Sequence, residues 1–377
     1  MGTKALETPD VPKVMTTTAI GISYCTATIG GEVSNDGGDM VTERGVYWGT
    51  TNNPTTKIAI GSGTGAYGQQ ITGLSEKTVY YYKAYAVNGA GESCGDVMCF
   101  TTKALTNGLF SINSLGNQVY FSQGNLQYQA STNTWRFAEN QWDFVGTQNP
   151  GSGYAGGTVS GSDNGNIAPT YSGWIDLFGW GTSGYDHGAQ DYQPWSTSTN
   201  YNSYFAYGNS TGSLYNQTGQ ADWGYNAISN GDNTENSGWR TLRISEWDYI
   251  CFTRTTASGI RYVHATVNNV PGVILLPDNW TTSIYALNSH ISNTITTADW
   301  TDILEVNGAV FLPVAGVRNG TKVHRINDYG IYWSSSFDNG STPYVRGLGF
   351  DTFNISTTSD ACRYYGSSVR LVRDYNP

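Results

Sequence analysis

Residues able to perform acid–base or metal chemistry are few in this chain, and they do not form a recognisable site. The chain has four scattered histidines without the paired spacing of a zinc site: His187, His264, His290 and His324. The acidic stretches Asp186–Asp191 and Asp232–Glu235 offer oxygen ligands, but neither matches a calcium loop such as the EF-hand. We therefore predict no catalytic residues, no metal site and no cofactor.

The five cysteines also lack the CxxC spacing of a metal or redox site. Cys94 and Cys99 lie close in sequence and Cys25 is able to approach them, so one disulfide is conceivable, with at least one thiol left free. Cys251 and Cys362 are the remaining two. Cys251 lies in an apolar segment with helical spacing, which favours a buried, inert thiol.

The composition favours a binding protein over an enzyme. Charged residues make up only 13% of the chain, whereas it holds 47 Gly, 27 Tyr and 12 Trp. Gly, Asn, Ser and Thr are poor helix formers, so we expect short strands and few helices. Because disordered chains are poor in aromatic residues, we expect the loops to be ordered. Tyr combined with Ser, Gly and Asn is also the composition of antibody binding loops, where rigid rings provide contact area.

The charge and hydropathy of the chain exclude several partners. A formal net charge of −10 disfavours nucleic acid and anionic membrane surfaces, which attract Lys and Arg. No run of about 20 apolar residues is present, so we expect no membrane insertion. Met1 to Pro12 lack the apolar core of a signal peptide. Either the start has been trimmed or the protein leaves its cell by another route, as a virion protein released by lysis does.

Residues 14–102 are predicted to form an all-β, Ig-like sandwich that follows an N-terminal tail over residues 1–13. Gly-rich turns separate a series of strand-like runs. These runs are Ala19–Thr28, Gly45–Trp48, Lys57–Ile60, Val79–Val87 and Val97–Phe100. The segment Leu74–Gly91 (LSEKTVYYYKAYAVNGAG) resembles fibronectin type III domains. The resemblance implies that Tyr80 forms a tyrosine corner and that the domain serves as a spacer or stalk.

Residues 103–108 are expected to be a linker to a second domain over residues 109–377. Its first expected strands are Val119–Phe121, Asn125–Tyr128 and Trp135–Phe137; later ones are Val273–Leu276, Val310–Val314, Ile331–Ser334 and Val369–Val372. A long stretch from Gly146 to Trp239 contains recurrent Trp and is expected to be packed. Short helices are predicted after a capping pattern at Ser245–Asp248 and at Thr296–Asp299, the second ending near Gly308.

The C-terminal segment carries the most informative motifs. Tyr332–Ser336 (YWSSS) and Gly366–Arg373 (GSSVRLVR) bracket about 30 residues. Five further motifs precede them in the sequence: Phe121–Tyr128, Gly173–Thr182, Trp239–Leu242, Gly272–Pro277 and Gly308–Pro313. Together these resemble C-type-lectin-fold variable proteins of diversity-generating retroelements, as in gut phages and Bacteroidetes. The resemblance implies an α+β C-type lectin-like domain whose terminal strands pair. It also implies that loops between Trp333 and Arg370 form one exposed binding face.

The residues between these motifs are consistent with a diversified surface. Adenine-directed diversification of Asn-type codons cannot produce Lys, Gln, Glu or Met, and Val323–Tyr365 contains none of the four. The alternative explanation is chance combined with strand composition. The predicted ligand-binding tips are Tyr329, Tyr332, Phe337, Asp338, Tyr344, Arg346, Asp351, Asn354, Asp360, Arg363 and Tyr364. Phe350, Phe353 and Tyr365 are the strongest candidates for core positions instead.

These features lead to the hypothesis of a receptor-binding protein on a virion surface, or on a bacterial cell surface if a signal sequence has been removed. The expected partner is a protein or glycan receptor on a bacterial cell. Two alternatives stay open. One is an undiversified surface adhesin or pilus-tip-like protein with the same fold. The other is an enzyme related to formylglycine-generating enzymes, which share the fold and use Cys; the cysteine arrangement here disfavours it.

We predict that ligand binding does not require calcium. Sugar-binding C-type lectins hold calcium through an acidic-Pro-Asn or Gln-Pro-Asp motif, whereas Gln193-Pro194 is followed here by Trp195, which has no carboxylate. Binding measured in a chelator should therefore equal binding measured with added calcium. Loss of binding in chelator that calcium restores would contradict the prediction.

Overall fold

The structure is a computed structural model, and it describes residues 8–22, 24–102, 108–145, 158–159, 167–337 and 342–376. The chain divides into two compact units, residues 1–105 and 106–377, and the division falls within the range expected for the linker. Each unit is described by itself. No helix in the described residues is long and apolar enough to cross a membrane.

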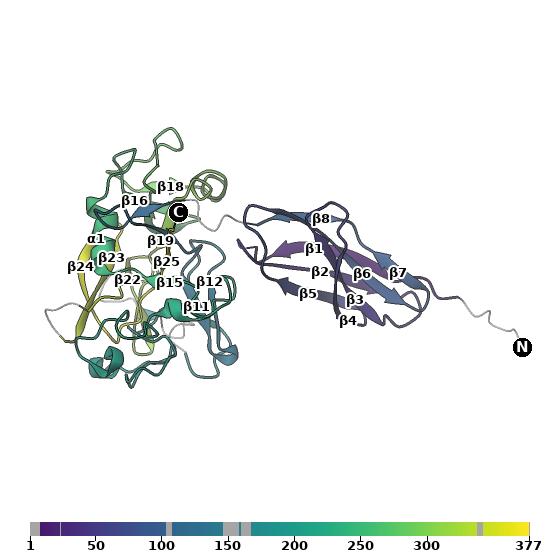
Figure 1. The fold of residues 1–377 in the computed structure, drawn as a ribbon, viewed down its shortest axis with the longest axis horizontal. Helices are drawn as coiled ribbons and strands as arrows, with labels where there is room; N and C mark the ends of the chain where they lie inside the picture. The colour runs from purple at the N-terminus through teal and green to yellow at the C-terminus, as the bar shows by residue number, and fades with distance from the viewer. Residues whose placement is uncertain are drawn as a thin grey trace, which may run out of the picture. The chain divides into compact units, whose positions relative to one another are not determined.

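The first unit is an all-β sandwich, as the sequence predicts (Figure 1). Its strands are β1 (Lys13–Ile20), β2 (Ala27–Asn35), β3 (Glu43–Gly49), β4 (Thr56–Gly61), β5 (Gly65–Ile71), β6 (Val79–Asn88), β7 (Gly91–Cys94) and β8 (Met98–Thr101). One sheet has the order β1-β2-β5 and the other β4-β3-β6-β7, with β8 also paired to β6. The run expected over residues 19–28 is divided between two strands, and the polar, Gly-rich strand β5 was not predicted.

Side chains from both sheets fill the space between them. Ile29 of β2, Val46 of β3 and Tyr82 of β6 belong to one buried cluster. Tyr80 confirms the tyrosine corner, because its hydroxyl accepts a hydrogen bond from the Ser75 backbone N–H at 2.9 Å. This bond fixes the turn that leads into β6.

All five cysteines lie in the described part of the chain, and none forms a disulfide. Cys94 pairs with Tyr85 of β6, while Cys99 pairs with Tyr81 of the same strand. Four residues of strand separate these positions by about 13 Å, whereas a disulfide spans Cα atoms at most about 7 Å apart. Closeness in sequence therefore does not bring these two thiols together.

The regular structure of the second unit consists mainly of short strands, arranged in several small sheets. The strands preceding the first helix are β9 (Phe110–Ser111), β10 (Gln118–Phe121), β11 (Leu126–Gln129), β12 (Thr134–Phe137), β13 (Thr158–Val159), β14 (Trp174–Ile175) and β15 (Trp239–Thr241). The later strands are β16 (Tyr262–Val267), β17 (Val270–Leu275), β18 (Asn293–Ile295), β19 (Val310–Pro313), β20 (Val317–Asn319), β21 (Lys322–His324), β22 (Tyr329–Trp333), β23 (Tyr344–Asp351), β24 (Ile355–Cys362) and β25 (Leu371–Asp374).

The two ends of this unit meet in one sheet of order β15-β25-β10-β9. The last strand, β25, lies antiparallel to both β10 and β15, with Phe121 opposite Val372. This is the pairing of terminal strands that the resemblance implies. β11 and β12 pair with each other, whereas β10 pairs with β9 and β25.

The two predicted helices are present and short. α1 (Ile244–Asp248) continues into a wider π-type turn over Tyr249–Thr253, and α2 (Thr297–Asp299) into one over Trp300–Leu304. Thr296 caps α2 through its side-chain oxygen, which accepts from Asp299 N at 3.0 Å. The residue that caps α1 is Arg243, two residues before the predicted cap at Ser245, because Glu246 accepts from Arg243 N at 2.7 Å and thereby closes the first turn.

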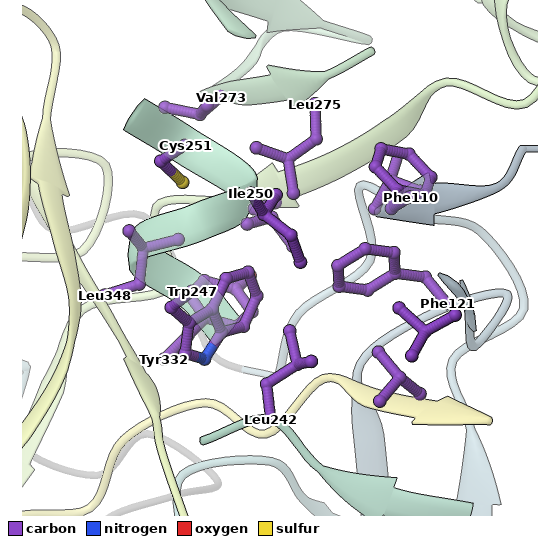
Figure 2. Close-up of a cluster of buried hydrophobic side chains, with 14 of the residues drawn as sticks. Phe110, Phe121, Leu242, Trp247, Ile250, Cys251, Val273, Leu275, Tyr332 and Leu348 are labelled. Carbon is purple, nitrogen blue, oxygen red and sulfur yellow. The ribbon is translucent and has the colours of Figure 1, made fainter. Parts of the chain in front are cut away.

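α1 supplies the centre of the larger hydrophobic core (Figure 2). Trp247 of α1 and Ile250 and Cys251 of the π-type turn that follows it point into a cluster that includes Phe121 of β10 and Leu348 of β23. The apolar spacing of residues 247–251 in the sequence thus becomes the face that joins the terminal sheet to the C-terminal strands. A second core lies around Trp280 and Trp300.

Residues 167–238 contain little regular structure but are well packed. Trp180 and Trp223 are fully buried, and their indole N–H groups donate to Ser334 O at 2.9 Å and Thr182 O at 3.0 Å. The sequence prediction of a packed aromatic segment is confirmed for this range. Gly146–Gly157 and Ser160–Asn166 lie outside the described residues.

We expect the two units to fold independently. Separate proteins covering residues 8–102 and 108–377 should each unfold in one cooperative transition, because each has its own buried core. Thermal unfolding followed by near-ultraviolet circular dichroism measures this directly. A second fragment that lacks a cooperative transition would show that its core depends on the first unit.

Candidate functional site

The predicted binding segment forms a three-stranded antiparallel sheet rather than a set of loops. β22 pairs with β23, and β23 pairs with β24. The expectation of loops between Trp333 and Arg370 is therefore corrected, since Tyr344–Asp351 and Ile355–Cys362 are each eight-residue strands. Leu348 and Phe350 pack in the core around α1, and Thr357 donates to Asp248 of α1 at 2.8 Å.

The motif Tyr332–Ser336 is buried and hydrogen-bonded throughout. Trp333 has no exposed surface, and its indole N–H donates to Phe178 O at 2.6 Å. Ser334 donates to Arg346 O at 2.7 Å and Ser335 donates to Thr241 O at 3.2 Å. The small hydroxyl side chains thus satisfy backbone carbonyls in places where larger residues would not fit.

Tyr332 is a correction to the predicted tips, because it is buried and does not project toward a ligand. Its ring stacks on that of Phe350 at 5.7 Å, and its hydroxyl donates to Pro313 O at 3.1 Å. Burial raises the pKa of this hydroxyl. The alternation of side chains along β22 places Tyr332 on the same face as its cross-strand partner Leu348, which faces the α1 core.

Arg370 of the second motif binds buried side chains beneath the segment between the two motifs. Its guanidinium donates to the side-chain oxygens of Gln141 and Asn125, and Asn125 donates in turn to the Tyr332 hydroxyl at 3.0 Å. Burial lowers the pKa of Arg370 to about 10, which leaves it protonated at neutral pH. The two sequence motifs that bracket the segment therefore meet in one buried polar network.

Arg363 is the second correction, because this predicted tip is fully buried. Its guanidinium lies 4.9 Å from the ring centre of Trp180, 5.0 Å from that of Phe205 and 4.8 Å from that of Phe337. It donates to Thr342 O and Ser210 O. Arg363 directly follows β24, where the chain turns inward, so its side chain binds two neighbouring loops together.

Most of the remaining predicted tips reach the surface. Tyr344, Asn354 and Asp360 are exposed, whereas Tyr329, Phe337, Arg346, Asp351 and Tyr364 are partly exposed. Asp338 lies outside the described residues. Arg346 and Asp360 are cross-strand partners with an N–O distance of 3.5 Å, and an exposed pair of this kind contributes little stability.

The turn between β23 and β24 exposes the aromatic ring of Phe353, which the sequence analysis gave as a candidate core residue. Phe353 is 83% exposed, whereas Phe350 is buried and Tyr365 is half-buried. The Asp351 carboxylate accepts from the backbone N–H groups of Phe353 and Asn354, both at 2.7 Å. Partial burial alone would raise the pKa of Asp351, but these bonds outweigh it and lower the pKa. Asp351 therefore holds the turn that exposes Phe353.

Four of the side chains with catalytic potential, Cys251, Cys362, His187 and Asp232, are buried at least in part or bonded to neighbouring groups. Burial raises the pKa of Cys251 to about 12, and partial burial raises that of Cys362. Both ring nitrogens of His187 are bonded to backbone, Nε2 to Gly181 O and Nδ1 to Tyr207 N. Asp232 is paired with Arg373 at 2.9 Å. The described residues contain no cluster of three or more His, Cys, Asp or Glu side chains suited to a metal.

The solved structures that resemble this chain include small β domains. No protein-family model matches the chain, and no curated protein matches it. Among solved structures, the sensor domain of the anti-sigma factor RsgI4 from Pseudobacteroides cellulosolvens is 19% identical, with a TM-score of 0.22, covering 26% of this chain and 98% of that one. The sixth fibronectin type III domain of human fibronectin type III domain containing protein 3 is 26% identical, with a TM-score of 0.22, covering 27% of this chain and 92% of that one.

We predict that buried motif residues control stability and exposed tips do not. Trp333→Ala should destabilise the second unit by roughly 3–5 kcal/mol, because it removes a large buried ring. Tyr344→Ala, which changes an exposed side chain, should alter stability by about 0.5 kcal/mol or less. Chemical denaturation measures both. An equal loss for the two variants would mean that Tyr344 also belongs to the core.

Proposed function

We propose that residues 109–377 form a ligand-binding domain of C-type lectin-like fold that presents a diversified surface on β23, β24 and their turns. The first unit would serve as its stalk. The proposed partner is a protein or glycan receptor on a bacterial cell. The proposed location is a virion surface, or a bacterial cell surface where a signal sequence has been removed.

The observation that carries the proposal is the separation of buried motif residues from exposed side chains within one short segment. Trp333, Ser334 and Arg370 are buried and bonded to distant parts of the unit, while Tyr344 and Asn354 face solvent. Exchange of such exposed residues costs little stability, whereas exchange of the buried ones costs much. A surface that must vary needs this arrangement. Tyr and Arg side chains are common anchors of protein interfaces.

The expected consequence is that exposed tips determine binding to cells. Labelled full-length protein should adsorb to some members of a panel of gut bacterial isolates. Tyr344→Ala or Arg346→Ala should weaken adsorption roughly tenfold or more, because few residues carry most of the affinity of an interface. The matched control is Tyr185→Ala, since Tyr185 is 43% and Tyr344 is 39% exposed and only Tyr344 lies in the proposed surface. Tip variants that adsorb like the unchanged protein would contradict the proposal.

The second candidate is an undiversified adhesin with the same fold, and the gene distinguishes the two. Diversification requires a near-repeat of the 3′ end beside a reverse transcriptase gene. It also requires substitutions at adenines in the codons of tips such as Tyr344 and Asn354, with Trp333 and Arg370 unchanged. Related genes that vary equally at buried and exposed positions would favour the adhesin.

A further inference from the structure

A polar cavity of about 790 Å³ lies beside the C-terminal strand of the second unit. Residues from the end of β25, from β15, from the start of α1 and from the turn between β9 and β10 line it, and it is open to solvent on one side. Its volume falls within the range of about 300–1,000 Å³ that is typical of small-molecule sites. None of the predicted tips that the structure describes lines it. It is therefore a separate site from the proposed binding surface.

The charged groups of the cavity largely neutralise one another. Arg240 binds Glu246 at 2.8 Å and Asp374 at 2.7 Å. The buried Asp222 carboxylate accepts from the Thr241 backbone N–H at 3.0 Å and from the Thr241 hydroxyl at 2.8 Å. With Arg243, the lining holds two cations against three carboxylates, a formal charge of −1. This balance favours neither a phosphate-like anion nor a strongly charged cation.

The rest of the lining is rich in groups that hydrogen-bond. Asn113, Asn117, Gln118 and Ser335 contribute amides and a hydroxyl, of which Gln118 Nε2 donates to Asp278 at 3.0 Å and the Ser335 hydroxyl to Thr241 O at 3.2 Å. Asn117 is exposed, and burial of its amide under an apolar ligand would cost free energy, because its bonds to water would be lost. Ile112 is the one aliphatic side chain among the lining residues that the structure describes. Hydroxyl groups both donate and accept hydrogen bonds, so a hydroxyl-rich ligand matches this lining.

One edge of the cavity carries a flat aromatic platform. Tyr215 is 43% exposed, and the guanidinium carbon of Arg243 lies 4.5 Å from its ring centre. This contact covers one face of the ring with the Arg243 guanidinium and restrains its orientation. The apolar face of a sugar ring packs well on such a surface, because its C–H groups meet the electron-rich face of the aromatic ring.

We infer that this cavity binds a neutral, hydroxyl-rich ligand of the saccharide class, with no metal ion required. The hydrogen-bonding lining would recognise the hydroxyl groups, and Tyr215 would hold one sugar ring at the opening. This site goes beyond the proposed function, since it shares no described residue with the tip surface. It would give the protein a ligand-binding capacity that does not vary with the tips.

The test uses the full chain, titrated in chelator with maltotriose, cellotriose, mannotriose and triacetylchitotriose as probes, by calorimetry and ligand-observed NMR. At least one probe should bind, and Tyr215→Ala should weaken its binding roughly tenfold or more. Asn117→Ala, which removes an exposed lining amide, should also weaken it. Tyr185→Ala is the matched control, because Tyr185 and Tyr215 are both 43% exposed.

Tyr344→Ala separates this inference from the proposed function. Full saccharide binding by Tyr344→Ala, together with loss in Tyr215→Ala, supports a separate cavity site. Binding lost in Tyr344→Ala and retained in Tyr215→Ala places the saccharide on the tip surface and overturns the inference. The inference is also overturned if no probe binds, or if inorganic phosphate binds in their place. Neither result bears on the tip surface, which the adsorption assay tests separately.

Discussion

The buried guanidinium of Arg370 is the contact on which the arrangement of the second unit depends. It lies one residue before the last strand and binds the side-chain oxygens of Asn125 and Gln141 from the beginning of the unit. The same Asn125 holds Tyr332, and Gln141 also accepts from the Phe311 backbone N–H at 2.8 Å. Hydrogen bonds from its two terminal nitrogens offset part of the cost of burying this charge, while its Nε has no hydrogen-bond partner. The network therefore fixes three strands, β19, β22 and β25, relative to the start of the domain.

Arginines and tryptophans recur in this role because the unit has little regular structure. Irregular segments leave carbonyl groups without helix or strand partners, and each must be satisfied when it is buried. A guanidinium has five N–H donors and an indole has one. Arg318 donates to Leu177 O and Gly320 O, and the indole of Trp239 donates to Gly231 O. The chain thus uses some of its few charged residues inside the unit, where they connect loops.

This construction explains how one sheet can combine a fixed interior with a changeable exterior. The motif residues on β22 and before β25 are bonded to segments more than 100 residues away, such as Phe178 and Asn125. The exposed ends of β23 and β24 interact chiefly with each other, as Arg346 does with Asp360. Substitution at the outer positions leaves the long-range bonds intact. We therefore expect substitutions at the exposed positions to leave the buried scaffold largely unaffected, as the proposed diversified surface would require.

The sequence by itself determined the features that depend on local pattern. The sandwich of the first unit followed from alternating strands, and the tyrosine corner from the spacing of Tyr80 within its motif. The starts of both helices were predicted to within two residues by cap residues such as Thr296. The strand expected at Ile331–Ser334 followed from its apolar run and corresponds to the end of β22. These features depend on neighbours close in the chain, which the sequence displays.

Only the tertiary structure decided the direction of individual side chains in the C-terminal segment. Tyr332 and Arg363 resemble surface anchors by residue type, yet both are buried, because their partners Pro313 and Ser210 come from distant segments. Phe353 resembles a core residue, yet a turn held by Asp351 places it in solvent. The polar cavity also joins residues from both ends of the unit, Asn113 and Asp374 among them. The residue type indicates which contacts a side chain is able to make. Only long-range packing determines whether that side chain faces the core or the surface.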